Sequence, residues 1–255
     1  MPHSDHPGID LLAGKVAVVV GGGRGIGRIT AMVLAREGAR VLVADISGAE
    51  KDVAAEIGPA AAAFRVDVTR EDEIEAMFAA AVQAFGQVDA SVHLAGPPGG
   101  RRGDEVTLEE YHDLTDVHLR GMLLCTKHAI RVMLPNGGGS IVNFSSTASL
   151  NADRRISPVY AAAKAGINSM TKAFALQYGP QGVRVNAVAP GFTLSEKNLA
   201  APPSLMSELA GKAALARAGD PEEQAQVTAF LCSDRASFVT GVIIPVDGGW
   251  SARLA

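Results

Sequence analysis

A tyrosine and a lysine four residues apart carry the clearest chemistry in this sequence. Tyr160 and Lys164 flank three alanines, shortly after a predicted strand that ends at Ser145-Ser146. The spacing places both side chains on one face of a helix. A free phenol has a pKa of about 10, too high for efficient proton transfer near neutral pH. Because a nearby ammonium lowers that pKa, the pair predicts a general acid or base acting on a carbonyl or an alcohol oxygen.

A glycine-rich loop near the N-terminus indicates a binding site for a dinucleotide. The segment 21–27, Gly-Gly-Gly-Arg-Gly-Ile-Gly, lies between the apolar run Val16–Val20 and a helical pattern. Glycines allow a tight turn and let the backbone approach a pyrophosphate closely. The free N–H groups and the dipole of the following helix then face the negative charge.

An acidic residue at the end of the next apolar run predicts which dinucleotide binds. Asp45 ends the run Val41–Ala44. A carboxylate there accepts hydrogen bonds from the adenosine ribose hydroxyls and repels a 2′-phosphate, which favours NAD over NADP. Arg24 favours NADP instead, because an arginine can pair with that phosphate. We give Asp45 the greater weight, and its side chain can also cap the helix that follows.

Seven apolar runs separated by helical patterns predict the architecture that positions these residues. Continuous apolar runs are typical of a parallel sheet covered on both faces. We expect an α/β fold, a Rossmann-like doubly wound sheet of about seven parallel strands with helices on both faces. Helices are expected after Gly25, over about Ser47–Glu56 and from Thr69. The predicted strands are Val16–Val20, Arg40–Ala44, Ala63–Val66, Ala90–Leu94, Ser140–Phe144, Arg184–Val188 and Val242–Val246.

Composition narrows the function classes. The chain has 255 residues, 47% of them hydrophobic, and a net charge of −4, which gives no reason to expect nucleic acid or an anionic membrane as partner. No apolar run is long enough to cross a bilayer. The two cysteines lie in apolar runs and are expected to be buried free thiols. We expect a flexible tail over 1–11, one dinucleotide-binding and catalytic domain over 12–255, a cytoplasmic location and no metal.

The ordered motifs resemble those of the short-chain dehydrogenase/reductase family, over about residues 12–250. The resemblance implies hydride transfer between a nicotinamide cofactor and a secondary alcohol or ketone. A 3-oxoacyl-type ketoreductase and a dehydrogenase of small or cyclic alcohols both fit, and the family also implies a homotetramer. The matching motifs are the glycine loop, Asp67-Val68, Leu94-Ala95-Gly96, Ser146, Tyr160 with Lys164, Asn186-x-x-x-Pro190-Gly191 and Asp247-Gly248-Gly249.

The resemblance implies a role for each matching residue. Ser146 would hold the substrate oxygen, with Ser145 and Thr147 as alternatives. Tyr160 would exchange the proton, and Lys164 would lower the tyrosine pKa and bind the nicotinamide ribose. The expected cofactor contacts, with Ser195 as an alternative to Thr193, are Gly21, Gly23, Arg24, Gly25, Ile26, Gly27, Asp45, Ile46, Asp67, Val68, Ala95, Gly96, Tyr160, Lys164, Pro190, Gly191 and Thr193.

Two histidines depart from the family's pattern. His118 replaces an asparagine that, in the family, helps to hold a water connecting the lysine to solvent. An imidazole also binds water and titrates near neutral pH. His118 is therefore either a fourth catalytic residue, in a relay that depends on its protonation, or a buried histidine beside an impaired relay. His93 replaces another asparagine and is expected to pack and hydrogen-bond within the sheet.

The substrate is expected between Ser146, Tyr160 and the segment 192–206. Leu194, Leu199, Leu205 and Met206 would form an apolar wall there or pack in the core. Two arginine pairs, 101–102 and 154–155, lie in flanking loops and are either solvated charges or an anion site. A non-catalytic nicotinamide-binding redox sensor is the alternative function. An epimerase or dehydratase is disfavoured because the chain ends soon after residue 249.

Overall fold

The computed structural model describes residues 10–97, 99–199 and 202–252, so residues 1–9 of the predicted tail lie outside the described part. Leu11 packs against the core, and its N–H donates to Glu37 Oε2 at 3.3 Å. The strands are β1 (Val16–Val20), β2 (Arg40–Asp45), β3 (Ala61–Arg65), β4 (Ala90–His93), β5 (Gly139–Phe144), β6 (Val183–Pro190) and β7 (Ile243–Val246). The helices are α1 (Gly25–Arg36), α2 (Glu50–Ile57), α3 (Glu71–Phe85), α4 (Leu108–Thr115), α5 (Gly121–Met133), α6 (Pro158–Tyr178), α7 (Glu196–Leu199), α8 (Pro203–Ala210) and α9 (Pro221–Cys232).

The strand order is that of a doubly wound fold. Within the described residues, seven parallel strands pair in the order β3-β2-β1-β4-β5-β6-β7. The order therefore reverses at β1, which pairs with β2 on one side and β4 on the other. In such sheets, ligands bind outside the carboxyl ends of the strands at the reversal point. The predicted fold class is confirmed, and a ligand site is expected at the carboxyl ends of β1 and β4.

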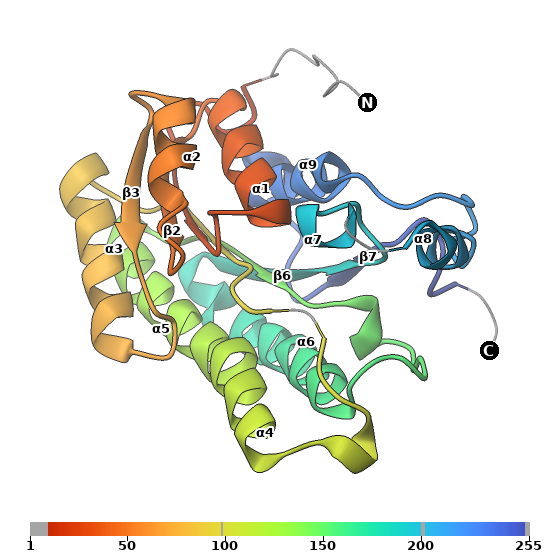
Figure 1. Ribbon diagram of the computed structural model, residues 1–255. Helices are drawn as coiled ribbons and strands as arrows, with labels where there is room; N and C mark the ends of the chain where they lie inside the picture. Colours follow the sequence, from red (N-terminus) through yellow and green to blue (C-terminus); the bar gives the residue numbers. More distant parts are fainter. Residues whose placement is uncertain (1–9, 98, 200–201, 253–255) are drawn as a thin grey trace.

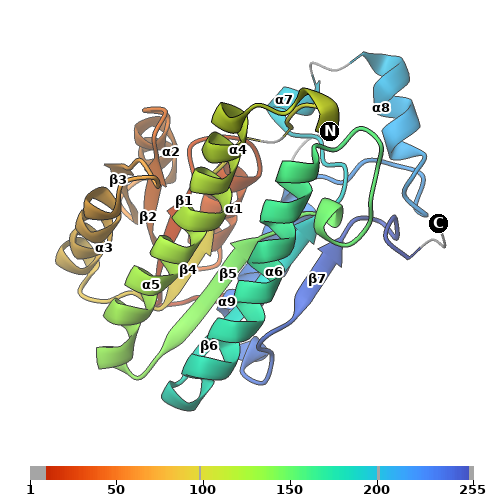
Figure 2. The same cartoon turned by 90° about the horizontal axis from the view of Figure 1, so that it is seen from below.

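Two helical layers cover the two faces of the sheet (Figures 1 and 2). Side chains alternate between faces along a strand. Ala17 and Val19 of β1 accordingly pack in a cluster with residues of α1 and α9. Val18 and Val20 pack in a second cluster with residues of α3 and α5. Because both faces are buried, the strands form the continuous apolar runs seen in the sequence.

Two helices begin later than the sequence predicted, and each has a local cause. α2 begins at Glu50 rather than Ser47 because Gly48 has a φ of +88°, outside the helical region. α3 begins at Glu71 rather than Thr69. There the Asp67 Oδ1 accepts bonds from both the backbone N–H and the hydroxyl of Thr69, which holds that residue in a turn.

Both cysteines are buried free thiols, as predicted. Cys125 on α5 and Cys232 at the end of α9 are 1% and 3% exposed. Burial raises the pKa of each thiol to about 12, so both stay protonated at neutral pH. No helix in the described part of the chain is long and apolar enough to span a membrane.

Candidate active site

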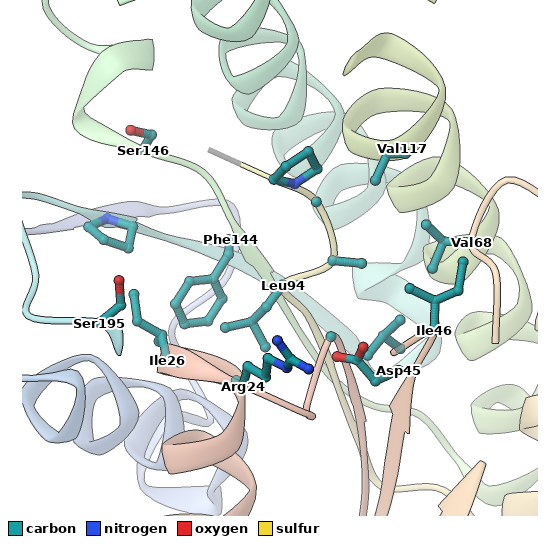
Figure 3. Close-up of a pocket in the computed structure, with 18 of the residues that line it drawn as sticks. Arg24, Ile26, Asp45, Ile46, Val68, Leu94, Val117, Phe144, Ser146 and Ser195 are labelled. Carbon is teal, nitrogen blue, oxygen red and sulfur yellow. The ribbon is translucent and has the colours of Figure 1, made fainter. Parts of the chain in front are cut away.

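Nearly all of the predicted site residues line one cavity of about 820 Å³ at the carboxyl ends of the central strands (Figure 3). Of the predicted set, Gly23 and His118 alone are not in its lining. The predicted residues that line it are Gly21, Arg24, Gly25, Ile26, Gly27, Asp45, Ile46, Asp67, Val68, Ala95, Gly96, Ser146, Tyr160, Lys164, Pro190, Gly191 and Thr193. Ser145 and Ser195, which the sequence offered as alternatives to Ser146 and Thr193, also line the cavity.

The conformation and close packing of the glycine loop require residues without side chains. A Cβ on Gly27 would lie 1.9 Å from the carbonyl oxygen of Gly21, closer than any side chain tolerates. Gly21 has a φ of +84°, and a Cβ there would lie 2.7 Å from the Ala95 nitrogen. The loop leads into the N-terminus of the 12-residue helix α1. Bare backbone against a helix N-terminus fits a dinucleotide pyrophosphate.

Asp45 braces the loop from the end of β2. Its Oδ2 accepts a hydrogen bond from Gly23 N at 2.9 Å, and its Oδ1 accepts one from Ser47 N at 2.9 Å. Gly23 therefore contributes through its backbone, although it does not line the cavity. Arg24 and Asp45 point toward one another (Figure 3). The carboxylate at the adenosine end is thus fixed in direction before any ribose is bound.

Lys164 is buried and held at the end of β5. It is 5% exposed, and its Nζ donates a hydrogen bond to the carbonyl oxygen of Phe144 at 2.8 Å. Burial lowers the pKa of Lys164 to about 7. Lys164 therefore titrates near neutral pH, whereas a solvent-exposed lysine stays protonated there.

Tyr160 carries a phenol whose acidity differs from the expectation. Burial raises the pKa of Tyr160, and a hydrogen bond with Ser146 opposes that rise. The expectation that the lysine lowers the tyrosine pKa is not met. The ammonium of Lys164 lies 5.7 Å from the centroid of the Tyr160 ring and is directed at Phe144 instead.

His118 lies behind the cavity, in a turn of π-helix (Asp116–Arg120) between α4 and α5. Its Nε2 bonds to the carbonyl oxygen of Pro97 at 2.8 Å, and its buried Nδ1 has no hydrogen-bond partner within the described part of the chain. With Lys164 and His93 it lines a second cavity of about 10 Å³, roughly the space of one water. Burial lowers the pKa of His118 to about 4, with the charge of Lys164 adding to the effect. Titration near neutral pH, which the relay interpretation invoked, is therefore a prediction that the structure contradicts.

His93 hydrogen-bonds within the sheet, as predicted. Its Nε2 contacts Ser91 Oγ at 2.8 Å and its Nδ1 contacts Asn143 Oδ1 at 2.9 Å. Asn143 Nδ2 in turn donates to Thr171 on α6 at 3.1 Å. Burial lowers the pKa of His93 to about 4. The imidazole thus links β4, β5 and α6 as a neutral group.

Three of the four loop arginines are engaged in intramolecular ion pairs. Arg101 Nε lies 3.3 Å from Glu110 Oε2, and Arg102 Nε lies 3.4 Å from Asp104 Oδ1. Arg155 pairs with Glu208 on α8. None of the four lines the cavity. The suggestion that these arginines form an anion site for the substrate is not supported, because three of them are paired with carboxylates and all four lie outside the cavity lining.

Several cavity residues were not foreseen. The expected apolar wall does not form: Leu194, Leu199, Leu205 and Met206 are absent from the lining, and this segment contributes Thr193, Ser195, Glu196 and Asn198. Strand ends could have revealed some of the others, because Phe144 is the last residue of β5 and Leu94 directly follows β4. No local signal points to the following lining residues: Ser47, Pro97, Val117, Glu196 and Asn198.

Comparison with known proteins decides the family. A sequence model described as enoyl-(acyl carrier protein) reductase matches residues 20–251. A cis-4-hydroxycyclohexanecarboxylate dehydrogenase of Sinomonas cyclohexanicum is 38% identical, over 95% of this chain and 99% of that protein. A cyclohexanol dehydrogenase of Acinetobacter sp. is 37% identical, over 94% and 96%. The chain belongs to the short-chain dehydrogenase/reductase family.

Structural comparison agrees with that assignment. A crystal structure from Agrobacterium tumefaciens, provisionally assigned as a gluconate dehydrogenase, matches with a TM-score of 0.91 and 32% identity, over 97% of this chain and 100% of that one. The protein is an NAD(P)-dependent oxidoreductase that acts on CH–OH and C=O groups, as predicted from the sequence. The alternative of a non-catalytic redox sensor finds no support among these relatives.

Proposed function

We propose that this short-chain dehydrogenase/reductase oxidises a secondary alcohol on a small carbocyclic ring, with NAD as the hydride acceptor. The observation that carries the proposal is the grouping of Ser146, Tyr160 and Lys164 in the lining of one cavity, where Tyr160 contacts both of the others. Relatives that cover nearly the whole chain bear names of ring-alcohol dehydrogenases. Leu94, Phe144 and Ile26 give the cavity an apolar floor (Figure 3).

The proposed ring alcohol is uncharged. Among the described residues that line the cavity, the cations are Arg24, at the adenosine end, and Lys164. A substrate carboxylate needs a cation or several N–H donors to replace its hydration. Glu196 instead adds a carboxylate to the lining, which disfavours a second negative charge nearby.

Each catalytic side chain then has one task. Ser146 Oγ holds the substrate hydroxyl, and the Tyr160 phenolate takes the hydroxyl proton as general base. Lys164 binds the nicotinamide ribose, while the neutral His118 keeps the Gly96–Pro97 segment in place through its bond to the Pro97 carbonyl. A nicotinamide held beside these residues would supply the acceptor for the hydride of the carbinol carbon. The backbone of the glycine loop, together with Val68, Ala95, Pro190 and Thr193, is assigned to hold the cofactor.

We assign NAD rather than NADP because of Asp45. A carboxylate fixed by Gly23 and Ser47 meets the ribose hydroxyls well and repels a 2′-phosphate. Arg24 does not reverse this preference, because its side chain points toward the Asp45 carboxylate (Figure 3), whose charge would repel a 2′-phosphate brought near the arginine.

We also infer one domain over 12–255, a homotetramer and a cytoplasmic location. One sheet that runs from β1 to β7 supports the single domain. Leu176 on α6 is 81% exposed and Phe238 is fully exposed, which supports burial of these faces between subunits. Two unpaired cysteines suit a reducing compartment. Analytical ultracentrifugation and cell fractionation test the last two inferences.

The deciding experiment is a turnover panel run with NAD and with NADP. The full-length protein is assayed with cyclohexanol, cis-4-hydroxycyclohexanecarboxylate, gluconate, an acyclic secondary alcohol and, in reverse, a 3-oxoacyl thioester. We expect the highest kcat/KM for cyclohexanol with NAD. Tyr160→Phe is the matched inactive control, and Arg101→Ala is expected to leave the KM for the carboxylated alcohol unchanged. Preference for the thioester or the acid would reject the proposed substrate.

A further inference from the structure

The hydroxyl of Ser149 joins the serine and the tyrosine sides of the active site. Ser149 ends a short 3₁₀ turn (Thr147–Ser149) that directly follows Ser146. Its Oγ donates to the carbonyl oxygen of Ser146 at 2.6 Å. It accepts from Asn168 Nδ2 at 2.8 Å and from Ser145 Oγ at 2.9 Å. One donated and two accepted bonds use the full capacity of a hydroxyl.

Asn168 belongs to the helix that carries the catalytic pair. It lies on α6, four residues after Lys164 and eight after Tyr160, so all three side chains share one helix face. Figure 2 shows α6 running beside the turn that follows β5. The helix therefore reaches the Ser146 segment at a third point, one turn beyond the lysine.

The side-chain amide of Asn168 lowers the stability of the folded protein. Its Oδ1 is buried and has no hydrogen-bond partner among the described residues. An unsatisfied buried acceptor destabilises a fold, whereas an apolar side chain of similar shape does not. A position that served packing alone would be better filled by leucine. The contact with Ser149 is thus the physical reason for an asparagine here.

The same network reaches the backbone on both sides. Ser145 Oγ also lies 3.2 Å from the carbonyl oxygen of Lys164, and Ser146 Oγ accepts a bond from Ala148 N at 3.1 Å. The bond to the Ser146 carbonyl restrains the backbone of that residue, and the bond from Ala148 N restrains the direction of its Oγ. The end of β5, the 3₁₀ turn and α6 are therefore held in one arrangement.

We propose that Asn168 and Ser149 are positioning residues that hold Ser146 in register with Tyr160 and Lys164. This inference rests on the proposed function, in which Ser146 holds the reacting oxygen. Asn168 acts through Ser149, and Ser149 acts through the Ser146 carbonyl. Neither side chain touches substrate or cofactor.

The test measures ring-alcohol oxidation and NADH affinity in Asn168→Leu, Ser149→Ala and the double variant. We expect kcat to fall by about 10-fold to 100-fold in each, because small misplacements of a reacting group have effects of that size. The dissociation constant of NADH, followed by its fluorescence, stays at the parent value. The double variant should be no worse than Ser149→Ala, because both changes break one linkage.

Two further variants keep the test independent of stability. Ser149→Thr retains the hydroxyl and should restore most of kcat. Ser233→Ala is the matched control, because the Ser233 hydroxyl also donates to a carbonyl three residues earlier, that of Phe230 at 2.8 Å, and lies outside the cavity. It should leave kcat unchanged. Asn168→Leu should unfold at a temperature no lower than the parent.

The outcomes separate this inference from the proposed function. If the parent turns over a ring alcohol and the kcat values of Asn168→Leu and Ser149→Ala lie within about twofold of the parent kcat, the positioning role alone is overturned. Loss of kcat together with NADH affinity and thermal stability also overturns it, in favour of a general structural role. A parent that oxidises no ring alcohol rejects the proposed function, and the inference with it.

Discussion

The imidazole of His118 meets the phenol ring of Tyr160 edge-on, with ring centroids 5.3 Å apart and an interplanar angle of 86°. Because burial lowers the pKa of His118 to about 4, the ring meets the tyrosine as a neutral group at neutral pH. Its Nε2 is engaged by Pro97 at 2.8 Å. The histidine therefore supports the tyrosine by contact rather than by charge.

His118→Asn is expected to change rate without changing pH dependence. From about pH 6 to about pH 9 the pH profile of kcat should keep its shape, while kcat falls by about 10-fold from the lost ring contact. Steady-state kinetics across that range check this. His112→Asn, on the exposed face of α4, is the control and should match the parent. Loss of an inflection near the ordinary histidine pKa in His118→Asn would restore the titrating relay.

Ser146→Ala should move the ascending limb of the pH profile of alcohol oxidation to higher pH. The hydrogen bond from Ser146 lowers the pKa of Tyr160 against the raising effect of burial. Removing that bond leaves burial unopposed, so the phenol loses its proton at higher pH and less general base is present at any given pH. The pH dependence of kcat/KM measures the shift. A limb that stays in place would mean that another group sets it.

Lys164→Met should alter stability in a pH-dependent way. Burial lowers the pKa of Lys164 from its ordinary 10.5 to about 7, so between these values the unfolded chain holds a proton that the folded protein has released. Unfolding then takes up a proton, and the stability of the parent rises with pH across that window. The free energy of unfolding in urea, parent minus Lys164→Met, should rise from about pH 7 to about pH 10. A constant difference would contradict the lowered pKa.

Asp45→Ala should shift cofactor preference toward NADP. Because one hydrogen bond to a charged group contributes about 1.5–3 kcal/mol, we expect the ratio of kcat/KM for NAD over NADP to fall by about 10-fold or more. Asp45→Asn keeps an acceptor for Gly23 N and separates loss of charge from loosening of the loop. Adding Arg24→Ala to Asp45→Ala should cancel any gain with NADP. An unchanged ratio in Asp45→Ala would remove Asp45 as the determinant.

Features with short sequence spacing could be predicted, and features that join distant segments could not. The glycine loop and the Tyr160–Lys164 pair each lie within one turn or helix, where residue type and spacing determine geometry. The Arg155–Glu208 ion pair joins residues 53 apart in the sequence. It could not be foreseen, so Arg155 was considered as a contact for an anionic substrate. Asn168 and Ser149, 19 residues apart, were missed for the same reason.

The direction of the pKa shifts also could not be predicted from the sequence. A lysine lowers the pKa of a nearby tyrosine only if it stays charged and lies close to the phenol oxygen. In the structure the Phe144 carbonyl takes the ammonium, and burial dominates both groups. Burial of this kind depends on how the whole sheet and α6 close around the side chain.

Because Cys125 and Cys232 are both buried, we expect thiol reagents to leave the folded protein unlabelled. Both thiols are buried with a pKa of about 12, and the chain has two cysteines in total. Leu199 on α7 is 58% exposed beside the cavity-lining Asn198. Leu199→Cys would therefore carry the one readily labelled thiol. A maleimide fluorophore attached there could report cofactor binding in the cavity, with no native cysteine to remove first.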